Sequence, residues 1–275
     1  MANKGLQFEW AILYEAKRRL NASEMSADDK SLLKQSKDKR GNDKAVLNSA
    51  SKMMKHIESL VPNNQTAKKA CWKSFVKVSG GGAEPKTDIL FKIGSKKYKC
   101  SMKYGKDIQL ASGGINTSIS YLNSVAETLR ENKGISAKSS KELMSIFAEL
   151  DENYNVGTKK QPEIKRLLNE VRAEGGLQDR LQRALGSGTS PDPAKEFIDF
   201  KEAVVLESMT GRATFGARND RTANYILSDS ELKPINAAYV KQVTSRASVR
   251  IRAKGRGKKE GIRYNEIVVS MDSTI

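Results

Sequence analysis

An aspartate, a serine and a lysine lie on two neighbouring segments whose residue pattern predicts strands. Asp88 stands directly before the apolar run ILFKI, and Ser101 and Lys103 lie in the next segment, KKYKCSMKYG. Because Gly94-Ser95 joins the two segments as a tight turn, we expect a hairpin that brings Asp88 close to Ser101 and Lys103. A carboxylate, a hydroxyl and an ammonium held together can orient a reacting molecule and transfer protons to or from it. This hairpin is therefore the first candidate for a catalytic site.

Side chains of the second predicted strand alternate between its two faces. The face expected to point into the core carries Tyr98, Cys100 and Met102. Ser101 and Lys103 are therefore expected together on the opposite face, near the end of the strand. The spacing by itself leaves a second interpretation open, which is an ordinary amphipathic hairpin with a lysine-rich outer face.

Four short elements follow one another along about the first 130 residues. They are a helix start, GLQFE with Glu9, the segment Pro85-Lys86-Thr87-Asp88, the segment Ser101-Met102-Lys103 with Gln109-Leu110 after it, and a helix at 117–132. In this order they resemble the motifs of the PD-(D/E)xK, or restriction-endonuclease-like, nuclease superfamily. The later stretch EAVVLESMTGRATFG extends the likeness, because some restriction-type nucleases carry a similar E-x-x-TG-x-x-x-F stretch.

The resemblance implies a metal-dependent nuclease that hydrolyses DNA phosphodiester bonds, an endonuclease rather than an exonuclease, of a kind that phages and mobile elements encode. Mg²⁺, or alternatively Mn²⁺, would be held by Asp88, Glu9 and a backbone carbonyl near position 102. The metal would lower the pKa of a bound water, and Lys103 would position that water or help to deprotonate it. Gln109 would orient the water or contact the DNA backbone; the alternative is a polar residue in a loop.

One position departs from the family pattern. Ser101 stands where the family usually has Asp or Glu, and a hydroxyl is a poor ligand for Mg²⁺. The missing carboxylate would then come from elsewhere: from Glu9 first, then from Glu207, with Glu84 and Glu202 as further candidates. The alternative is a catalytically inactive relative that binds DNA at its ends or as an architectural component.

The chain is strongly basic, with 49 Lys and Arg residues against 32 Asp and Glu residues, a net charge of +17. This excess predicts a polyanionic partner, and DNA is favoured over RNA because RNA binding leaves the Asp88 and Lys103 pattern unexplained. The excess is concentrated in a predicted basic hairpin whose turn is assigned to Gly255 and Gly257. We expect its seven cations to contact backbone phosphates: Arg250, Arg252, Lys254, Arg256, Lys258, Lys259 and Arg263.

Composition excludes several classes of protein. Two cysteines form no disulfide framework and no zinc site, and no run approaches the roughly 18–20 apolar residues of a membrane span. The N-terminus lacks the apolar region of a secretory signal. We therefore expect a soluble, cytoplasmic protein with no membrane partner.

Helical and strand patterns mix along the chain, which predicts an α+β (mixed α/β) fold, a restriction-endonuclease-like sheet flanked by helices. Residues 1–132 are assigned to N-terminal helices and the nuclease-like core, and 133–190 to a charged helical insertion. Residues 191–275, a helix and the basic hairpin, are assigned to the same domain as the core. A homodimer stays an open alternative, and the sequence leaves open whether the insertion is a dimerisation arm or a lid.

Overall fold

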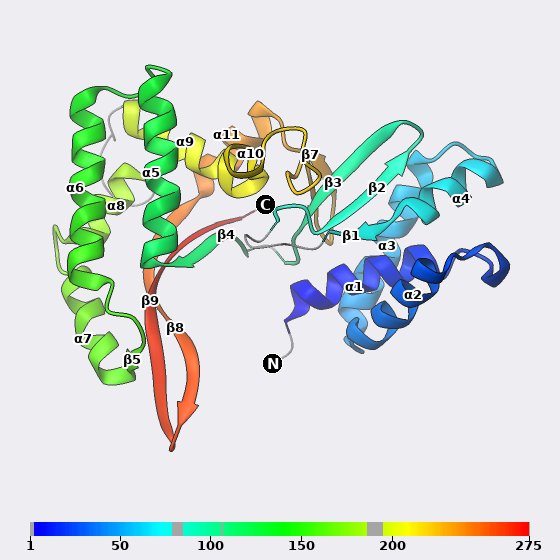
Figure 1. Ribbon diagram of the computed structural model, residues 1–275, viewed down its shortest axis with the longest axis horizontal. Coiled ribbons are helices and arrows are strands. Elements are labelled where there is room, and N and C mark those ends of the chain that lie inside the picture. The colour runs from blue at the N-terminus through cyan, green and yellow to red at the C-terminus, as the bar shows by residue number, and fades with distance from the viewer. Residues whose placement is uncertain (1–2, 79–84, 106, 186–194, 275) are drawn as a thin grey trace. The chain divides into compact units, whose positions relative to one another are not determined.

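The computed structural model describes residues 3–78, 85–105, 107–185 and 195–274 (Figure 1). The fold is mixed α+β, as predicted. The chain divides into two compact units. The first unit comprises Met1–Lys106 and Met209–Asn236, and the second comprises Asp107–Ser208 and Ala237–Ile275.

A five-stranded sheet forms the centre of the first unit, in the order β1-β2-β3-β6-β7. The predicted hairpin is confirmed: β2 and β3 are antiparallel, with Ile89 opposite Cys100, and Gly94 in the turn has φ +59°. Strand β6 pairs with β3 in parallel, while β1 and β7 add antiparallel edges. The strands are β1 (Val76–Lys77), β2 (Ile89–Ile93), β3 (Lys96–Met102), β6 (Tyr225–Leu227) and β7 (Leu232–Pro234).

Four α-helices supply the core that backs this sheet: α1 (Lys4–Lys17), α2 (Ala27–Lys39), α3 (Lys44–Leu60) and α4 (Gln65–Ser74). A short 3₁₀ helix, η1 (Ala22–Glu24), joins α1 to α2. Ser26 caps the start of α2: its hydroxyl accepts from the Asp29 N–H, and the Asp29 carboxylate accepts from the Ser26 N–H. Tyr98, Cys100 and Met102 are buried against these helices, so the predicted core face of β3 is confirmed.

The opposite face of β3 carries Lys97 and Lys99, and it is covered by the segment after α9 (Lys195–Thr210). This segment begins with the short helix α10 (Arg212–Phe215). Gly211 makes the corner between the two helices with φ +66°, a conformation that favours glycine.

The second unit contains its own sheet, in the order β4-β9-β5, with β8 paired to β9. Its strands are β4 (Asp107–Gly114), β5 (Lys159–Lys160), β8 (Ser248–Lys259) and β9 (Ile262–Thr274). The helices of this unit, besides most of α9, are α5 (Ile115–Glu131), α6 (Ala137–Tyr154), α7 (Gln161–Val171), α8 (Leu177–Ala184) and α11 (Ala237–Arg246). Among the described residues, no helix is long and apolar enough to cross a membrane.

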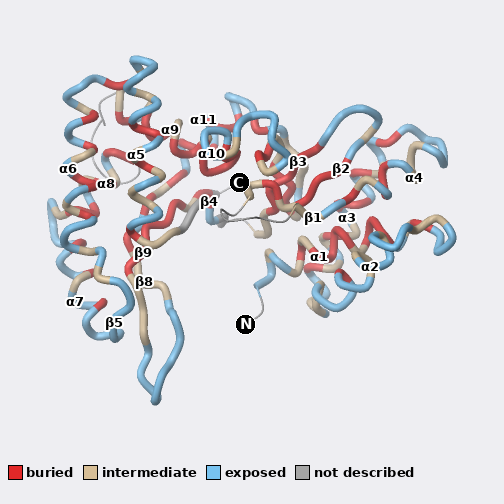
Figure 2. The backbone as a smooth tube through the Cα atoms, viewed as in Figure 1, coloured by how far each residue is buried: buried red, intermediate tan, exposed pale blue. Residues whose placement is uncertain are grey.

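Strands β8 and β9 form the predicted basic hairpin, and Figure 2 shows that its distal half is exposed. The predicted position of its turn is wrong. Glu260 and Gly261 make the turn, both with positive φ, whereas Gly255 and Gly257 flank a register shift within β8. Both central residues of a two-residue hairpin turn adopt positive φ, and strand β9 pairs as far as Ile262, so only Glu260 and Gly261 remain to connect the strands.

The two units cross the boundaries expected from the sequence. The expected core ended at residue 132, but β4 and α5 belong to the second unit, together with the helices of the expected insertion. The expected C-terminal part is divided, because Met209–Asn236 belongs to the first unit and the basic hairpin to the second. The physical reason is strand pairing, since β4 and β9 lie side by side although α5 to α11 separate them in the chain.

A buried lysine joins three helices of the first unit. Lys17 has a side chain only 1% exposed, and its Nζ donates to Asp29 Oδ1 at 2.6 Å and to the backbone oxygen of Lys73 at 2.9 Å. Removal of the one acid that pairs with a buried cation costs several kcal/mol, because the remaining charge has no compensation.

We therefore expect Asp29→Ala to lower the free energy of unfolding by about 3 kcal/mol. Urea unfolding followed by tryptophan fluorescence measures this, because both tryptophans, Trp10 and Trp72, lie in the first unit. Asp28→Ala is the control, since Asp28 lies in the same helical turn and is exposed. Equal losses of stability in the two variants would contradict the structural role of the Lys17–Asp29 pair.

Candidate functional site

The Asp88 carboxylate is fixed to the end of β3 by backbone hydrogen bonds. The Asp88 N–H donates to the Cys100 oxygen at 2.9 Å, and the Met102 N–H donates to Asp88 Oδ2 at 2.7 Å. Asp88 precedes β2 directly, as expected, and the antiparallel register places it opposite Ser101. The position of this carboxylate therefore follows from the pairing of β2 with β3.

Lys103 follows β3 directly, and its N–H donates to the Leu227 oxygen on β6 at 2.9 Å. Its charge acts on Asp88 in the direction that lowers the pKa of that carboxyl, against the larger raising effect of burial. The expected proximity of Asp88 and Lys103 is thus present, with both residues at the same end of the β2–β3 pair.

Glu9 reaches the same group of charges from α1. Its charge raises the pKa of Asp88, so the two carboxylates are close enough to repel each other. Glu9 Oε2 also accepts from Lys77 Nζ at 2.5 Å, and Lys77 lies over the Trp10 ring at 5.1 Å. We call Glu9, Lys77, Asp88 and Lys103 the charge cluster.

Sequence reasoning missed Lys77. The residue belongs to the two-residue strand β1, which is too short to show an alternating pattern, and it lies 68 positions from Glu9 in the chain. Only the pairing of Lys77 with Ile89, across β1 and β2, carries this lysine to the side of the sheet that α1 covers. No local signal in the sequence predicts that contact.

Opposing effects set the protonation of Asp88. Burial, with the Glu9 charge as the second cause, raises the pKa of the Asp88 carboxyl to about 6. The Met102 N–H bond and the charges of Lys103 and Lys77 act in the lowering direction but do not cancel that rise. Carboxyls whose pKa is shifted by burial and by specific charged partners are concentrated at functional sites, because catalysis requires groups with tuned protonation.

The donor set around Asp88 fits a metal ion that keeps much of its water. Among the described residues, no group of three or more His, Cys, Asp or Glu side chains could hold a metal ion. Asp88 and Glu9 nevertheless form a pair of repelling carboxylates, and Mg²⁺ is usually held by one or two carboxylates and several waters. A divalent cation between the two would remove their repulsion.

Ser101 is buried, with 4% of its surface exposed, and it lies opposite Ile226 of β6 on the central strand of the sheet. It brings no charge to the site. Of the acids considered as replacements, Glu9 is the one that interacts with Asp88, while Glu84 lies outside the described residues.

The remaining candidates from the sequence belong to the second unit. Gln109 is an exposed residue of β4. Glu207 is buried near the end of α9, and Glu202 is half-buried on the same helix. Burial raises the pKa of Tyr121, and the charge of Glu207 adds to that rise. The site described above consists of first-unit residues alone, so roles for Gln109 and Glu207 in it stay predictions.

The seven expected phosphate contacts lie on the two strands of the basic hairpin. Arg250, Arg256, Lys258, Lys259 and Arg263 are exposed, and Arg252 and Lys254 are half-buried. Two of them have partners within the unit, since Arg252 donates to the Ser270 hydroxyl and Arg256 pairs with Glu266. The cations beyond the register shift at Gly255 therefore dominate the exposed tip.

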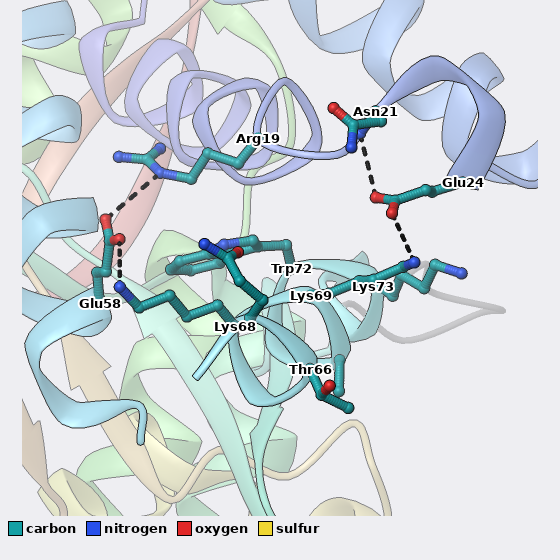
Figure 3. A pocket seen from close by; sticks show the side chains of 11 residues that line it. Arg19, Asn21, Glu24, Glu58, Thr66, Lys68, Lys69, Trp72 and Lys73 are labelled. Atoms are coloured by element: carbon teal, nitrogen blue, oxygen red, sulfur yellow. Dashed lines mark hydrogen bonds and ion pairs between the residues drawn. The ribbon is translucent and has the colours of Figure 1, made fainter. Parts of the chain in front are cut away.

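A second feature of the first unit is a pocket of about 850 Å³ between the C-terminal end of α1, η1, α3 and α4 (Figure 3). Figure 3 shows Glu58 between Arg19 and Lys68, and Glu24 bonded to Lys69. None of the four residues of the charge cluster lines this pocket, so the pocket is separate from the charge cluster. The two acids of the pocket, Glu24 and Glu58, pair with Arg19, Lys68 and Lys69 and so offset part of its positive charge.

Comparisons of the chain with protein-family models, with curated proteins and with solved structures find no match.

The raised pKa of Asp88 predicts that its charge destabilises the fold. The folded chain binds the Asp88 proton more tightly than the unfolded chain does, so this contribution to stability is present below about pH 4 and is lost as the pH rises to about 6. Asp88→Asn should therefore stabilise the first unit by about 2 kcal/mol at pH 8, and hardly at all at pH 4.

Urea unfolding in EDTA, again followed by tryptophan fluorescence, tests this expectation at both pH values. Asp38→Asn is the matched control, since it removes one negative charge from an exposed position on α2. A destabilised Asp88→Asn variant at pH 8 would show that Asp88 is a structural acid rather than a strained functional one.

Proposed function

We propose that the protein is a Mg²⁺-dependent deoxyribonuclease that cleaves phosphodiester bonds at the charge cluster. The observation that carries the proposal is the convergence of Asp88, Glu9 and Lys103 at one end of the β2–β3 pair, with the Asp88 carboxylate held by the Met102 N–H. This is the arrangement that the resemblance to PD-(D/E)xK nucleases leads one to expect.

Asp88 and Glu9 would hold the metal ion in this proposal. When bound, Mg²⁺ supplies an acidified water and positive charge for the phosphate oxygens. The Met102 N–H keeps Asp88 Oδ2 in place, so the carboxylate loses little conformational freedom when it accepts a ligand.

Lys103 would act on the attacking water in this proposal. Its N–H donates to the Leu227 oxygen on β6, and its positive charge interacts with the Asp88 carboxylate. An ammonium in this position orients a water and stabilises the negative charge that develops on the phosphate in the transition state.

The basic hairpin would bind the sugar–phosphate backbone without reading bases. Its seven cations are interleaved with glycines, and no Asn or Gln, the residues that pair with adenine edges, lies between Arg250 and Arg263. Part of the +17 charge would thus serve to bind DNA of any sequence.

An inactive DNA-binding protein is the second candidate function, and two observations favour it. Ser101 supplies no carboxylate, and Lys77 already neutralises Glu9. In this case the fold and the basic hairpin would serve binding alone.

Cleavage separates the two functions. With Mg²⁺ or Mn²⁺ the protein should cut plasmid and linear DNA, and EDTA should abolish cutting. Asp88→Asn and Lys103→Ala should each lower the rate at least about 100-fold, because each removes a metal ligand or a positioned ammonium. Both variants should still bind DNA in EDTA, and Asp38→Asn should cut normally. Tight DNA binding with no cutting by the unmodified protein would instead establish the inactive alternative.

Binding through the hairpin should depend on salt. Lys258→Gln, Lys259→Gln and Arg263→Gln together should weaken binding to unrelated duplexes equally, and should lower the slope of log K against log salt by about one unit for each phosphate that the variant no longer neutralises. Fluorescence anisotropy in EDTA at several salt concentrations measures both quantities. The control replaces the exposed residues Lys138, Lys141 and Lys165 of the same unit by Gln. Equal slopes in the two triple variants would mean that the hairpin is only a solvated surface.

A further inference from the structure

The first unit carries a second concentration of positive charge, on the segment from Gly211 to Thr222, which we call the arginine loop. It contains Arg212, Arg218 and Arg221, with Asp220 as its single acid. Arg212 and Arg218 are exposed, and Arg221 lies over the Phe215 ring at 4.5 Å.

Two lysines of β3 hold the arginine loop in a defined conformation. The Lys99 side chain is buried, and its Nζ donates to the backbone oxygens of Asn219 at 2.8 Å and Ala217 at 3.3 Å. Lys97 pairs with Asp220 at 3.1 Å, and the Thr222 hydroxyl donates to the Gly216 oxygen at 2.7 Å. A loop fixed in this way presents its exposed side chains at little cost in conformational entropy.

The arginine loop also contacts the segment that leads into Asp88. The N–H groups of Lys86 and Thr87 both donate to the Arg221 oxygen, at 3.0 and 3.1 Å. Gly211 packs so closely on this segment that a Cβ atom there would lie 2.8 Å from the Lys86 side chain. The loop and the candidate catalytic carboxylate are thus joined by direct backbone bonds, one residue from Asp88.

Cations outnumber acids among the charged residues that the structure describes on this surface. Besides the three arginines, Lys97 and Lys99 lie beneath the loop. Asp220 pairs with Lys97, whereas Lys99 donates to backbone oxygens. Burial, and secondarily the neighbouring charges of Lys97 and Arg212, hold the pKa of Lys99 below its usual value against the opposing effect of Asp220. A surface of this kind attracts a polyanion, and arginine in particular forms paired hydrogen bonds with phosphate oxygens.

We propose that the arginine loop is a phosphate-binding site, in which Arg212 and Arg218 hold backbone phosphates of the DNA next to the bond that the charge cluster cleaves. The inference rests on the proposed nuclease function and adds to it a residue set that positions the substrate. Its ligand is the phosphodiester backbone, recognised by charge and by oxygen geometry rather than by base.

Anisotropy with a fluorescent 20–30 base-pair duplex in EDTA tests the loop without cleavage. Arg212→Gln with Arg218→Gln should weaken binding about tenfold near 0.1 M salt and lower the salt slope by about two units, one for each phosphate that an arginine neutralises. Arg212→Lys with Arg218→Lys should recover most of the slope but less of the affinity, because lysine keeps the charge and lacks the paired geometry. Unchanged thermal unfolding should accompany both variants, since the two side chains are exposed.

The matched control is Lys52→Gln with Lys55→Gln, two exposed lysines on α3 of the same unit. If the arginine variant binds with the same affinity and slope as this control, the loop is not a phosphate site, whatever the protein cleaves. If the unmodified protein binds no DNA in EDTA and cuts none with Mg²⁺, the proposed function itself is wrong. If the unmodified protein does not cut DNA but the arginine variant lowers the salt slope of binding, the loop is a phosphate site of an inactive DNA-binding protein.

Discussion

The bond from the Met102 N–H to Asp88 Oδ2 determines the geometry of the candidate site. It is a charge-assisted bond, worth about 1.5–3 kcal/mol, and it joins the start of β2 to the end of β3. Lys103 is the next residue after Met102, and its own N–H is bound to β6, so one strand end places both the carboxylate and the ammonium. Glu9 and Lys77 then reach this point from α1 and β1.

The rigidity of that strand end comes from the core beneath it. The rings of Phe75, Phe91 and Tyr98 stack across the hairpin at centroid distances of 4.5 and 4.8 Å, nearly parallel to one another. Lys17, also buried, ties α1 to α2 and to the end of α4 through its bonds to Asp29 and to Lys73. These contacts offset the cost of the charge cluster, where the carboxylates of Glu9 and Asp88 repel each other.

Positive charge is used in two different ways in this chain. In the charge cluster, Lys77 and Lys103 accompany two acids, so the local charge is balanced and its arrangement decides the chemistry. On the basic hairpin and the arginine loop, cations outnumber acids and most of them are exposed. They therefore attract a polyanion to the surface as a group. Lys99 belongs to neither group, because its charge is directed at backbone oxygens that shape the arginine loop.

Features that depend on local pattern could be predicted from the amino-acid sequence. Alternation along β3 and the Gly94 turn predicted the core face and the approach of Lys103 to Asp88, because strand periodicity and turn chemistry act over a few residues. Contacts between distant segments could not be predicted, because they exist only once the strands have paired. Lys77 pairs with Glu9 although the two residues are 68 positions apart in the chain. The arginine loop lies beside the segment before Asp88 because β6 pairs in parallel with β3. Strand register, which is set by the partner strand, also places the hairpin turn at Glu260 and Gly261 instead of the predicted Gly255 and Gly257. Pairing with β9 likewise makes β4 part of the second unit.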